Sequence, residues 1–326
     1  MGFLDDLKVT MSNLVRSFAQ ISHKDVQIAG GKGASLGEMT RAKIPVPPGF
    51  VVLSSAFDRF LEETDIGVDI EAILKKVNHK DINSVDRASN EIRSLVEKED
   101  FPKDLAQAVF DNFKQLGAPL VAVRSSATAE DSKVASWAGE LETYLNTTRN
   151  NLLTNIKKCW SSLFTTRAIF YRFEKKLHKT KVSVAVVVQA MIQSEVAGIT
   201  FTVHPVTEDP NQILIEAGYG LGEAIVSGSI TPDSYVVDKK NFTLLDINVA
   251  EQKFYLKRGK SGGTVRVNSP KAQAGKQKLA GRQIVTLAQL CQRVEKHYGF
   301  PCDIEWAYAQ GKFYIVQSRP ITTLKK

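Results

Sequence analysis

Cysteine is scarce in this chain of 326 residues: three occur, and no two of them are spaced as C-x-x-C. Such cysteines provide no thiolate metal site and suit a reducing compartment. Long apolar runs are also lacking. The longest, residues 182–192, is too short to span a bilayer and contains Gln189. No basic-then-apolar leader opens the sequence, so we expect a cytoplasmic protein.

Acidic residues are absent between Lys257 and Arg282, where eight Lys and Arg residues occur. This segment alone equals the formal net charge of +8. A basic run usually forms a solvated loop or an exposed hairpin, and attraction of a polyphosphate ligand or of nucleic acid are the alternatives. The run has no aromatic residue on which a base could stack, which weakens the nucleic-acid alternative.

The pattern of apolar residues changes along the chain. Hydrophobic residues make up 43% of it, which is ordinary for a globular protein, and its length allows two domains. Helical spacing dominates over residues 54–116 and 150–177, whereas alternating strand patterns follow. We therefore predict an α+β chain with a helix-rich lobe over residues 1–187 and a strand-rich lobe over residues 188–326. Small ligands commonly bind between such lobes.

The stretch "QIAGGKGASLGEM" places Lys32 between glycines, just before an expected helix over residues 34–43. A lysine in this setting suggests a phosphate contact. The Walker pattern G-x-x-x-x-G-K-[ST] nevertheless fails twice, because Val26 stands at the first glycine and Gly33 at the Ser/Thr position. If Lys32 holds a phosphate, it does so in a different architecture.

An arginine lies at the end of the buried strand expected in "PLVAVRSSAT", and hydroxyl side chains follow it. Arg124 keeps its charge, and its planar fork matches two phosphate oxygens at once. The alternative is a structural ion pair of Arg124 with Glu130 or Asp131. The residues alone leave both interpretations open.

Two polar pairs lie on the last two expected strands, "CDIEWAYA" and "KFYIVQSR". Strand alternation puts Asp303 and Glu305 on one face of the first strand, and Gln317 and Arg319 on one face of the second. A two-residue turn would place the two pairs on opposite faces of the hairpin. A three-residue turn over residues 309–311 would bring all four to the same face, and the glycine at its end favours this turn.

Two acids, an amide and an arginine on one face would be costly in a buried sheet without a ligand. A magnesium nucleotide explains the arrangement, since carboxylate oxygens would take the cation and Arg319 a phosphate. A solvated hairpin face is the alternative.

Five stretches of the chain carry a family resemblance. They are "GGKGASLGEM", "IPVPPGF", "AVRSSATAEDS…WAGELETYLN", "EAGYGLGEAIVSG…TPD" and "EKHYGFPCDIEWAYAQGKFYIVQSRPIT". In this order they resemble the nucleotide-binding domain of the dikinase family, which includes phosphoenolpyruvate synthase, pyruvate phosphate dikinase, rifampin phosphotransferase and glucan water dikinase. The similarity covers about residues 27–322. It is greatest to the phosphoenolpyruvate synthases and the rifampin enzymes, because the large insertions of the plant-type dikinase are absent.

The resemblance implies an ATP-grasp fold, in which two α+β lobes close on ATP. By the same resemblance, Lys32 and Arg124 reach the triphosphate. Gly139 and Thr143 would line the same cleft. Gln189 would lie on the strand that runs along the adenine side.

The resemblance also assigns roles to the final hairpin. Glu305 and Gln317 would hold magnesium or ribose-phosphate oxygens, with Asp303 assisting, so the expected cofactors are ATP and Mg²⁺. Arg319 would neutralise charge on the transferring phosphoryl group. Glu216, in the glycine-rich stretch, would face the cleft. The residues expected to be catalytic are Arg319, Arg124 and Lys32.

Two parts of the family pattern are missing. In the family, ATP donates to a histidine within a glycine-rich Thr-Ser-His motif on a swivelling domain. Only "ISHKD" at residues 21–25 offers Ser-His, and it lacks the glycines, so it is not assigned this role. The barrel that handles pyruvate and phosphoenolpyruvate is not matched either. We expect the phosphohistidine and pyruvate-binding domains on another chain, or removed from this sequence.

The function expected from these features is that of the ATP-binding half of a phosphoenolpyruvate synthase-like dikinase. The full reaction converts ATP, pyruvate and water to AMP, phosphoenolpyruvate and phosphate. An antibiotic phosphotransferase half, with a rifamycin as acceptor, would use the same chemistry. From other classes, a non-catalytic nucleotide sensor and a nucleic-acid-binding module built on the basic segment are the alternatives, and the retained acidic pair argues against a sensor.

Overall fold

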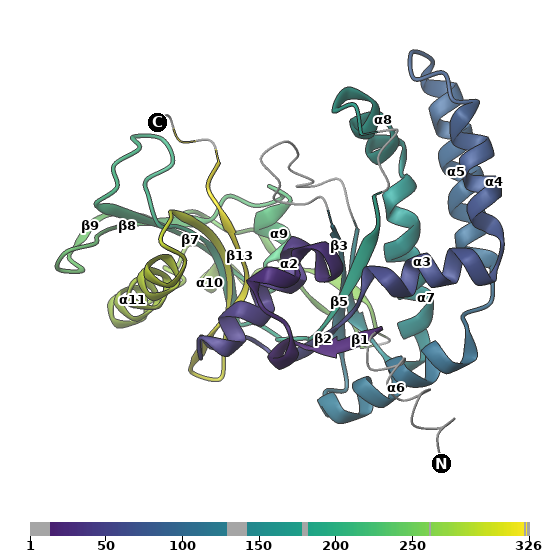
Figure 1. Cartoon of the computed structure of the whole chain (residues 1–326). Helices are drawn as coiled ribbons and strands as arrows, with labels where there is room; N and C mark the ends of the chain where they lie inside the picture. Colours follow the sequence, from purple (N-terminus) through teal and green to yellow (C-terminus); the bar gives the residue numbers. More distant parts are fainter. Residues whose placement is uncertain (1–13, 129–141, 178–181, 261, 323, 325–326) are drawn as a thin grey trace. The chain divides into compact units, whose positions relative to one another are not determined.

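A computed structural model describes residues 14–128, 142–177, 182–260, 262–322 and 324 (Figure 1). The chain divides into two compact units. The first comprises the chain up to Glu38 and from Pro48 to Met191, and the second comprises Met39–Pro47 and the chain from Ile192 onward. In the described ranges, no helix is long and apolar enough to cross a membrane.

The first unit is rich in helices and contains a five-stranded antiparallel sheet in the order β1-β2-β5-β3-β4. Its strands are β1 (Val15–Ser17), β2 (Gly49–Val52), β3 (Val121–Ala127), β4 (Thr143–Thr147) and β5 (Val184–Ala190). Its α-helices are α2 (Val26–Arg41, which runs three residues past this unit), α3 (Ser54–Glu63), α4 (Ile66–Lys75), α5 (Ile82–Lys98), α6 (Lys103–Leu116), α7 (Leu152–Ser161) and α8 (Thr166–Glu174). The boundary expected after residue 187 falls inside β5, and the first unit keeps this strand whole.

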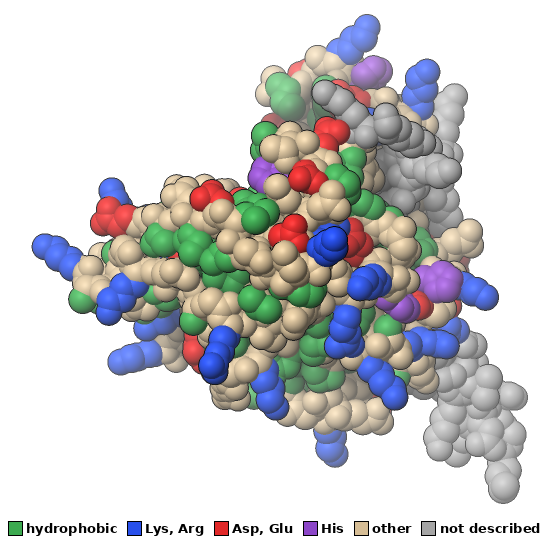
Figure 2. Space-filling view, turned by 90° about the vertical axis from the view of Figure 1, so that its left-hand side faces the viewer, with side chains coloured by type: hydrophobic (Ala, Val, Ile, Leu, Met, Phe, Trp, Pro, Cys, Tyr) green, Lys and Arg blue, Asp and Glu red, His purple; other side chains and the backbone are tan. Residues whose placement is uncertain are grey.

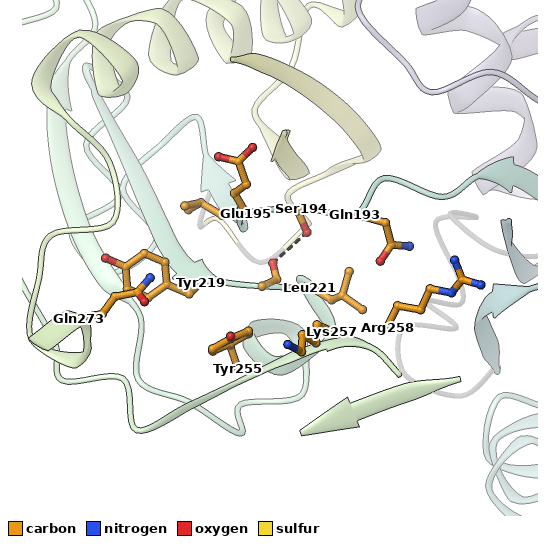
Figure 3. Close-up of a pocket in the computed structure, with 11 residues that line it drawn as sticks. Gln193, Ser194, Glu195, Tyr219, Leu221, Tyr255, Lys257, Arg258 and Gln273 are labelled. Carbon is orange, nitrogen blue, oxygen red and sulfur yellow. Dashed lines mark hydrogen bonds between the residues drawn. The ribbon is translucent and has the colours of Figure 1, made fainter. Parts of the chain in front are cut away.

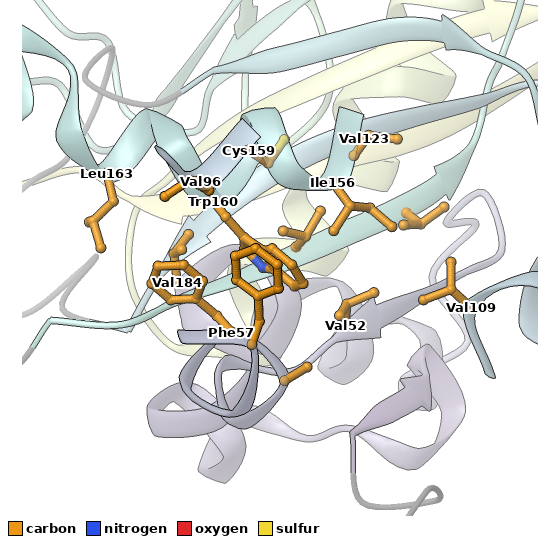
Figure 4. Packing of buried hydrophobic residues seen from close by; sticks show 14 of the residues in the cluster. Val52, Phe57, Val96, Val109, Val123, Ile156, Cys159, Trp160, Leu163 and Val184 are labelled. Carbon is orange, nitrogen blue, oxygen red and sulfur yellow. The ribbon is translucent and has the colours of Figure 1, made fainter. Parts of the chain in front are cut away.

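The core of the first unit lies between one face of this sheet and the helices (Figure 4). Alternate residues of β3 and β5, such as Val123 and Val184, supply the sheet side. Trp160 of α7 is fully buried, and its ring centroid lies 5.6, 5.0 and 5.1 Å from those of Phe57, Phe60 and Phe101. Trp160 is therefore a core residue.

The second unit is rich in strands, so the predicted α+β class and the division into helix-rich and strand-rich parts are confirmed. Its six-stranded antiparallel sheet has the order β13-β12-β6-β7-β8-β9. These strands are β6 (Val196–Phe201), β7 (Gln212–Tyr219), β8 (Asp233–Asp238), β9 (Leu244–Asn248), β12 (Cys302–Ala309) and β13 (Lys312–Pro320). The helices of this unit are α9 (Glu223–Val226), α10 (Lys271–Ala274) and α11 (Gly281–Tyr298).

Helix α11 covers one face of the six-stranded sheet. Its apolar positions recur every three to four residues and are buried: Ile284, Leu287, Ala288, Cys291 and Val294. The helix contacts β7, β8 and β12, and it ends at Gly299, whose φ of 75° is the left-handed conformation common after a helix. Residues at alternate strand positions, such as Ile215 and Ile304, are fully buried on this side. The opposite face carries the two polar pairs predicted for the last hairpin.

The basic segment forms a two-stranded antiparallel ribbon, as the exposed-hairpin interpretation predicts. Strand β10 (Phe254–Arg258) pairs with β11 (Thr264–Asn268), and most of their side chains are exposed.

Lys278 differs from the other cations of the basic segment, because its side chain is buried. The side chains of Lys278 and Asp233 are both 0% exposed, and Nζ of Lys278 lies 2.7 Å from Oδ1 of Asp233. The backbone N–H groups of Lys278 and Ala250 donate to the same carboxylate, at 2.8 and 2.9 Å. One buried carboxylate thus fixes both ends of residues 250–278.

Candidate nucleotide-binding site

The glycine-rich stretch of α2 is interrupted at Gly30, where φ is 67° and ψ is 170°, a combination essentially restricted to glycine. A Cβ atom at this position would lie 2.1 Å from Oγ and 2.5 Å from the carbonyl oxygen of Ser126. Three residues later, the N–H of Gly33 donates to the same Oγ at 3.4 Å. Lys32 therefore lies in the first turn after a break in the helix. Amide groups at such a helix start attract anions.

Three residues assigned by the resemblance share one face of the first unit's sheet. Arg124 on β3 pairs directly with Thr143 on β4, and Ala122 pairs with Gln189 on β5. Directly opposed residues, and alternate residues along a strand, point to the same side of a sheet. Arg124 and Gln189 are buried, at 9% and 3% exposure, whereas Thr143 is exposed.

This face is also the one against which the broken start of α2 packs. Ser126, the contact of that helix, stands two residues after Arg124 on β3 and so points to the same side. The first unit thus brings Lys32, Arg124, Thr143 and Gln189 to one side of a single sheet. Glu130 and Asp131, the ion-pair alternatives for Arg124, and the expected cleft residue Gly139 lie outside the described residues.

The hairpin of the second unit corrects the predicted turn. Ala309 pairs with Lys312, so the turn has two residues, Gln310 and Gly311, rather than the predicted three. Both turn residues have positive φ, 51° and 76°, which is the type I′ conformation that matches the twist of a hairpin. The prediction failed because glycine suits this turn as well as the three-residue one.

The predicted grouping on one face is nevertheless present, for another reason. The register shifts next to Glu305, where Val316 is left as an extra residue in β13. Beyond this bulge, Glu305 is directly opposite Gln317 and Asp303 is directly opposite Arg319. All four side chains therefore lie on the face opposite α11.

The electrostatics of this face are those of partly buried acids beside one arginine. Nε and Nη2 of Arg319 both lie 2.8 Å from Oδ2 of Asp303. Burial raises the pKa of Asp303 most strongly, Arg319 opposes this effect, and the charge of Glu305 adds to it. Burial and then the charge of Asp303 raise the pKa of Glu216. Partial burial together with neighbouring carboxylates therefore raises the pKa of both Asp303 and Glu216.

Glu216 joins this face through β6. Ile199 pairs with Glu305 on one side and with Glu216 on the other, so both glutamates point the same way. Their backbones are two strand spacings, about 10 Å, apart. Glu216 thus lies on the same face as the acidic pair, and its expected place in the cleft stays a prediction.

A cavity of about 580 Å³ lies at the end of β7 (Figure 3). Tyr219, Tyr255 and Gln273 lie on one side of it, and Gln193 and Arg258 on the other. The sequence did not predict this cavity, because its lining residues come from segments that are far apart in the chain. The basic ribbon thus contributes to a cavity wall as well as to an exposed surface.

Comparison with protein families identifies a nucleotide-binding domain in this chain. Residues 26–326 match the family described as pyruvate phosphate dikinase, AMP/ATP-binding domain. The chain belongs to this family, and the resemblance found in the sequence is confirmed. ATP binding is the property of the domain that this match supports.

Relatives of the chain carry two kinds of name. A probable phosphoenolpyruvate synthase of Methanocaldococcus jannaschii is 46% identical over 94% of this chain and 26% of its own length. The phosphoenolpyruvate synthase of Pyrococcus furiosus is 39% identical over 96% of this chain and 44% of its own length. The rifampicin phosphotransferase of Bacillus subtilis is 38% identical over 96% of this chain and 36% of its own length. The chain therefore spans about a quarter to a half of these relatives.

Proposed function

We propose that the chain binds ATP. In the first unit, Lys32 and Arg124 would contact the triphosphate, with Thr143 beside them and Gln189 on the adenine side. In the second unit, the acidic face of the hairpin would bind the metal and the reacting phosphate. The observation that supports this most directly is the cross-strand alignment of Asp303 with Arg319 and of Glu305 with Gln317.

The oxygen donors of this face fit Mg²⁺. Within the described ranges, no group of three or more His, Cys, Asp or Glu residues is arranged to hold a metal ion. Mg²⁺ usually takes one or two carboxylates and completes its shell with water and substrate phosphates. Glu305 and Gln317 would provide hard oxygen donors, and Asp303 a third. When bound, the ion would shield the negative charge of the triphosphate.

The chemistry that we propose is phosphoryl transfer from ATP to a histidine on a separate domain. In such a transfer the protein mainly positions groups and stabilises charge, and Arg319 would stabilise charge on the transferring group. The full reaction would convert ATP, pyruvate and water to AMP, phosphoenolpyruvate and phosphate, as the names of the archaeal relatives suggest. The phosphohistidine and pyruvate-binding domains would lie outside this sequence. The three cysteines are free and buried, which suits a cytoplasmic location.

The assignment of the acidic face can be tested by substitution. Arg319→Ala and Glu305→Ala should each lower ATP turnover, measured with a histidine-domain partner, by about 10²- to 10³-fold. Far-UV circular dichroism should stay unchanged. Lys240→Ala, which removes an exposed cation of the same unit, serves as the control and should keep normal turnover. Near-normal turnover in Arg319→Ala would remove this residue from the mechanism.

A rifamycin acceptor is the second candidate, because a rifampicin phosphotransferase is among the relatives. The chain should be combined with a histidine-domain partner and offered pyruvate or a rifamycin in parallel. AMP formed only with pyruvate supports the synthase function, and AMP formed only with the rifamycin supports the alternative. Saturable ATP binding without AMP formation in either mixture would favour a nucleotide sensor.

A further inference from the structure

A groove of about 590 Å³ lies in the second unit, away from the acidic face. Three separate segments line it: helix α11, the tip of the β12–β13 hairpin, and Pro45 from the segment Met39–Pro47. The N–H of Ile315 donates to the carbonyl oxygen of Pro45 at 2.8 Å, and Arg293 donates to that of Lys43 at 3.3 Å. These bonds hold the third wall against the other two.

The groove is electropositive. Arg282, Arg293 and Lys312 line it, and no acid is among its lining residues. Within the described part of the chain, none of these three cations forms an ion pair. The neighbouring Glu195 lines the other cavity, where its Oε1 accepts the N–H of Gln310 at 2.9 Å. Cations gathered in a concave surface without counter-charge attract an anion.

Cations are common on the surface of this protein in general. In Figure 2, Lys and Arg side chains project from much of the lower part of the face drawn, where few Asp or Glu side chains are visible. A general excess of cations attracts any anion weakly, so charge alone does not define a site. The groove differs from such a surface in its concave shape and in its aromatic lining.

Aromatic residues also contribute to the lining at the hairpin tip. The side chain of Tyr308 is half-buried and that of Phe313 is buried, and their ring centroids lie 4.7 Å apart. Tyr314 is a lining residue too, but strand alternation points its side chain to the other side of the sheet. Aromatic rings provide flat apolar surfaces for a planar group, and a tyrosine hydroxyl adds a hydrogen-bonding group. Cations beside aromatic rings suit a ligand that is anionic at one end and planar at the other.

We propose that this groove binds a small phosphate ester that carries an aromatic or other planar unsaturated group. The site is separate from the acidic face. Strand alternation puts Tyr308 on the same side of β12 as Ile304 and Trp306, which is the side that α11 covers, whereas Asp303 and Glu305 point to the other side. Its volume lies within the usual range for small-ligand sites.

Calorimetric titration of the chain with phenyl phosphate tests the proposal. A non-hydrolysable ATP analogue and Mg²⁺ are present throughout, so that nucleotide-binding residues are occupied. One saturable site is expected. Arg282→Gln and Lys312→Gln should each weaken binding about two- to fivefold, and the double variant by about tenfold or more. Lys296→Gln removes an exposed cation of α11 that does not line the groove and should change affinity less than about twofold.

Three results would overturn the proposal. The first is the absence of saturable binding at millimolar phenyl phosphate. The second is an equal loss of affinity in Lys296→Gln, which indicates attraction to surface cations only. The third is unchanged affinity in the double variant, which places the ligand elsewhere. Inorganic phosphate and phenol, titrated separately, should each bind more weakly than phenyl phosphate, and equal binding of inorganic phosphate would exclude the aromatic contribution.

A spectroscopic measurement locates the ligand independently. The ring of Trp306 lies 5.7 Å from that of Phe313, a lining residue, so the indole N–H resonance of Trp306 should shift during the titration. The shift should follow the calorimetric curve and disappear in the double variant. A shift that persists in the double variant would place the effect outside the groove.

Discussion

Replacement of Gly30 by alanine tests the packing that positions Lys32. The φ/ψ combination at Gly30 costs a residue with a side chain about 1–3 kcal/mol. The new Cβ would also lie 2.5 Å from the backbone oxygen of Ser126, which cannot rotate away as its Oγ can. Crowding of this kind costs about 1–3 kcal/mol. The two contributions predict a loss of roughly 2–6 kcal/mol in the free energy of unfolding of the first unit.

Two matched variants separate the contributions. Gly117 also has a positive φ, 66°, but no atom lies within 4 Å of the position that an added Cβ would take, so Gly117→Ala should lose only about 1–2 kcal/mol. Gly33 has ordinary helical geometry, and its added Cβ would lie 3.1 Å from side chains of Ala29 and Val51, so Gly33→Ala should stay within about 1 kcal/mol of the parent. The expected order of destabilisation is therefore residue 30, then 117, then 33.

Urea unfolding measures these differences. Tryptophan fluorescence should be followed in a Trp306→Phe background, so that the signal excludes the second unit and includes Trp160 in the first unit's core. Calorimetry should also show weaker ATP binding in Gly30→Ala but not in Gly117→Ala, because only the first displaces the turn that carries Lys32. If Gly30→Ala were no less stable than Gly117→Ala, the contact between α2 and β3 would be refuted.

Two further predictions concern the second unit. Lys278→Met should destabilise it by about 3–5 kcal/mol in urea, because the buried carboxylate of Asp233 loses its partner. Lys75→Ala, which breaks an exposed pair on α4, is a control in the first unit and should cost that unit less than about 0.5 kcal/mol. A loss as small as that of the control would contradict the buried pairing. Glu216→Gln should stabilise the unit at neutral pH, because burial and the charge of Asp303 raise the pKa of Glu216 and so disfavour its ionised form in the fold. The gain should vanish as the pH falls below the ordinary pKa of 4.5, and unfolding curves that show no such pH dependence would reject the cause.

The sequence predicted the strands, and the side chains that share one face of each strand, better than it predicted the turn and the bulge that connect them. Alternation alone placed Asp303 with Glu305 and Gln317 with Arg319, since a strand permits no other arrangement of these spacings. The turn could not be predicted, because Gly311 suits a two-residue and a three-residue loop equally. No residue type in the sequence indicates the bulge at Val316, because the bulge arises from the way the two strands pair.

The predicted start of the helix that contains the glycine-rich stretch was also wrong. The sequence predicts a helix that begins at residue 34, after Lys32, whereas α2 begins at Val26 and is broken at Gly30. Consecutive glycines weaken a helix when considered alone. Here close packing against β3 requires the glycine at position 30, because a side chain there would collide with Ser126. That contact joins residues almost a hundred positions apart, so only the fold reveals it.

The bulge in β13 has a consequence for how this hairpin tolerates changes in length. Adding one residue to the turn and deleting one residue at position 316 would leave the number of residues between Glu305 and Gln317 unchanged. With the spacing between Glu305 and Gln317 unchanged, a two-residue turn without the bulge would pair Glu305 with Val316 and would turn Gln317 and Arg319 to the side of the sheet that α11 occupies. Homologous hairpins of this length should therefore combine a two-residue turn with a bulge, or a three-residue turn with an uninterrupted ladder.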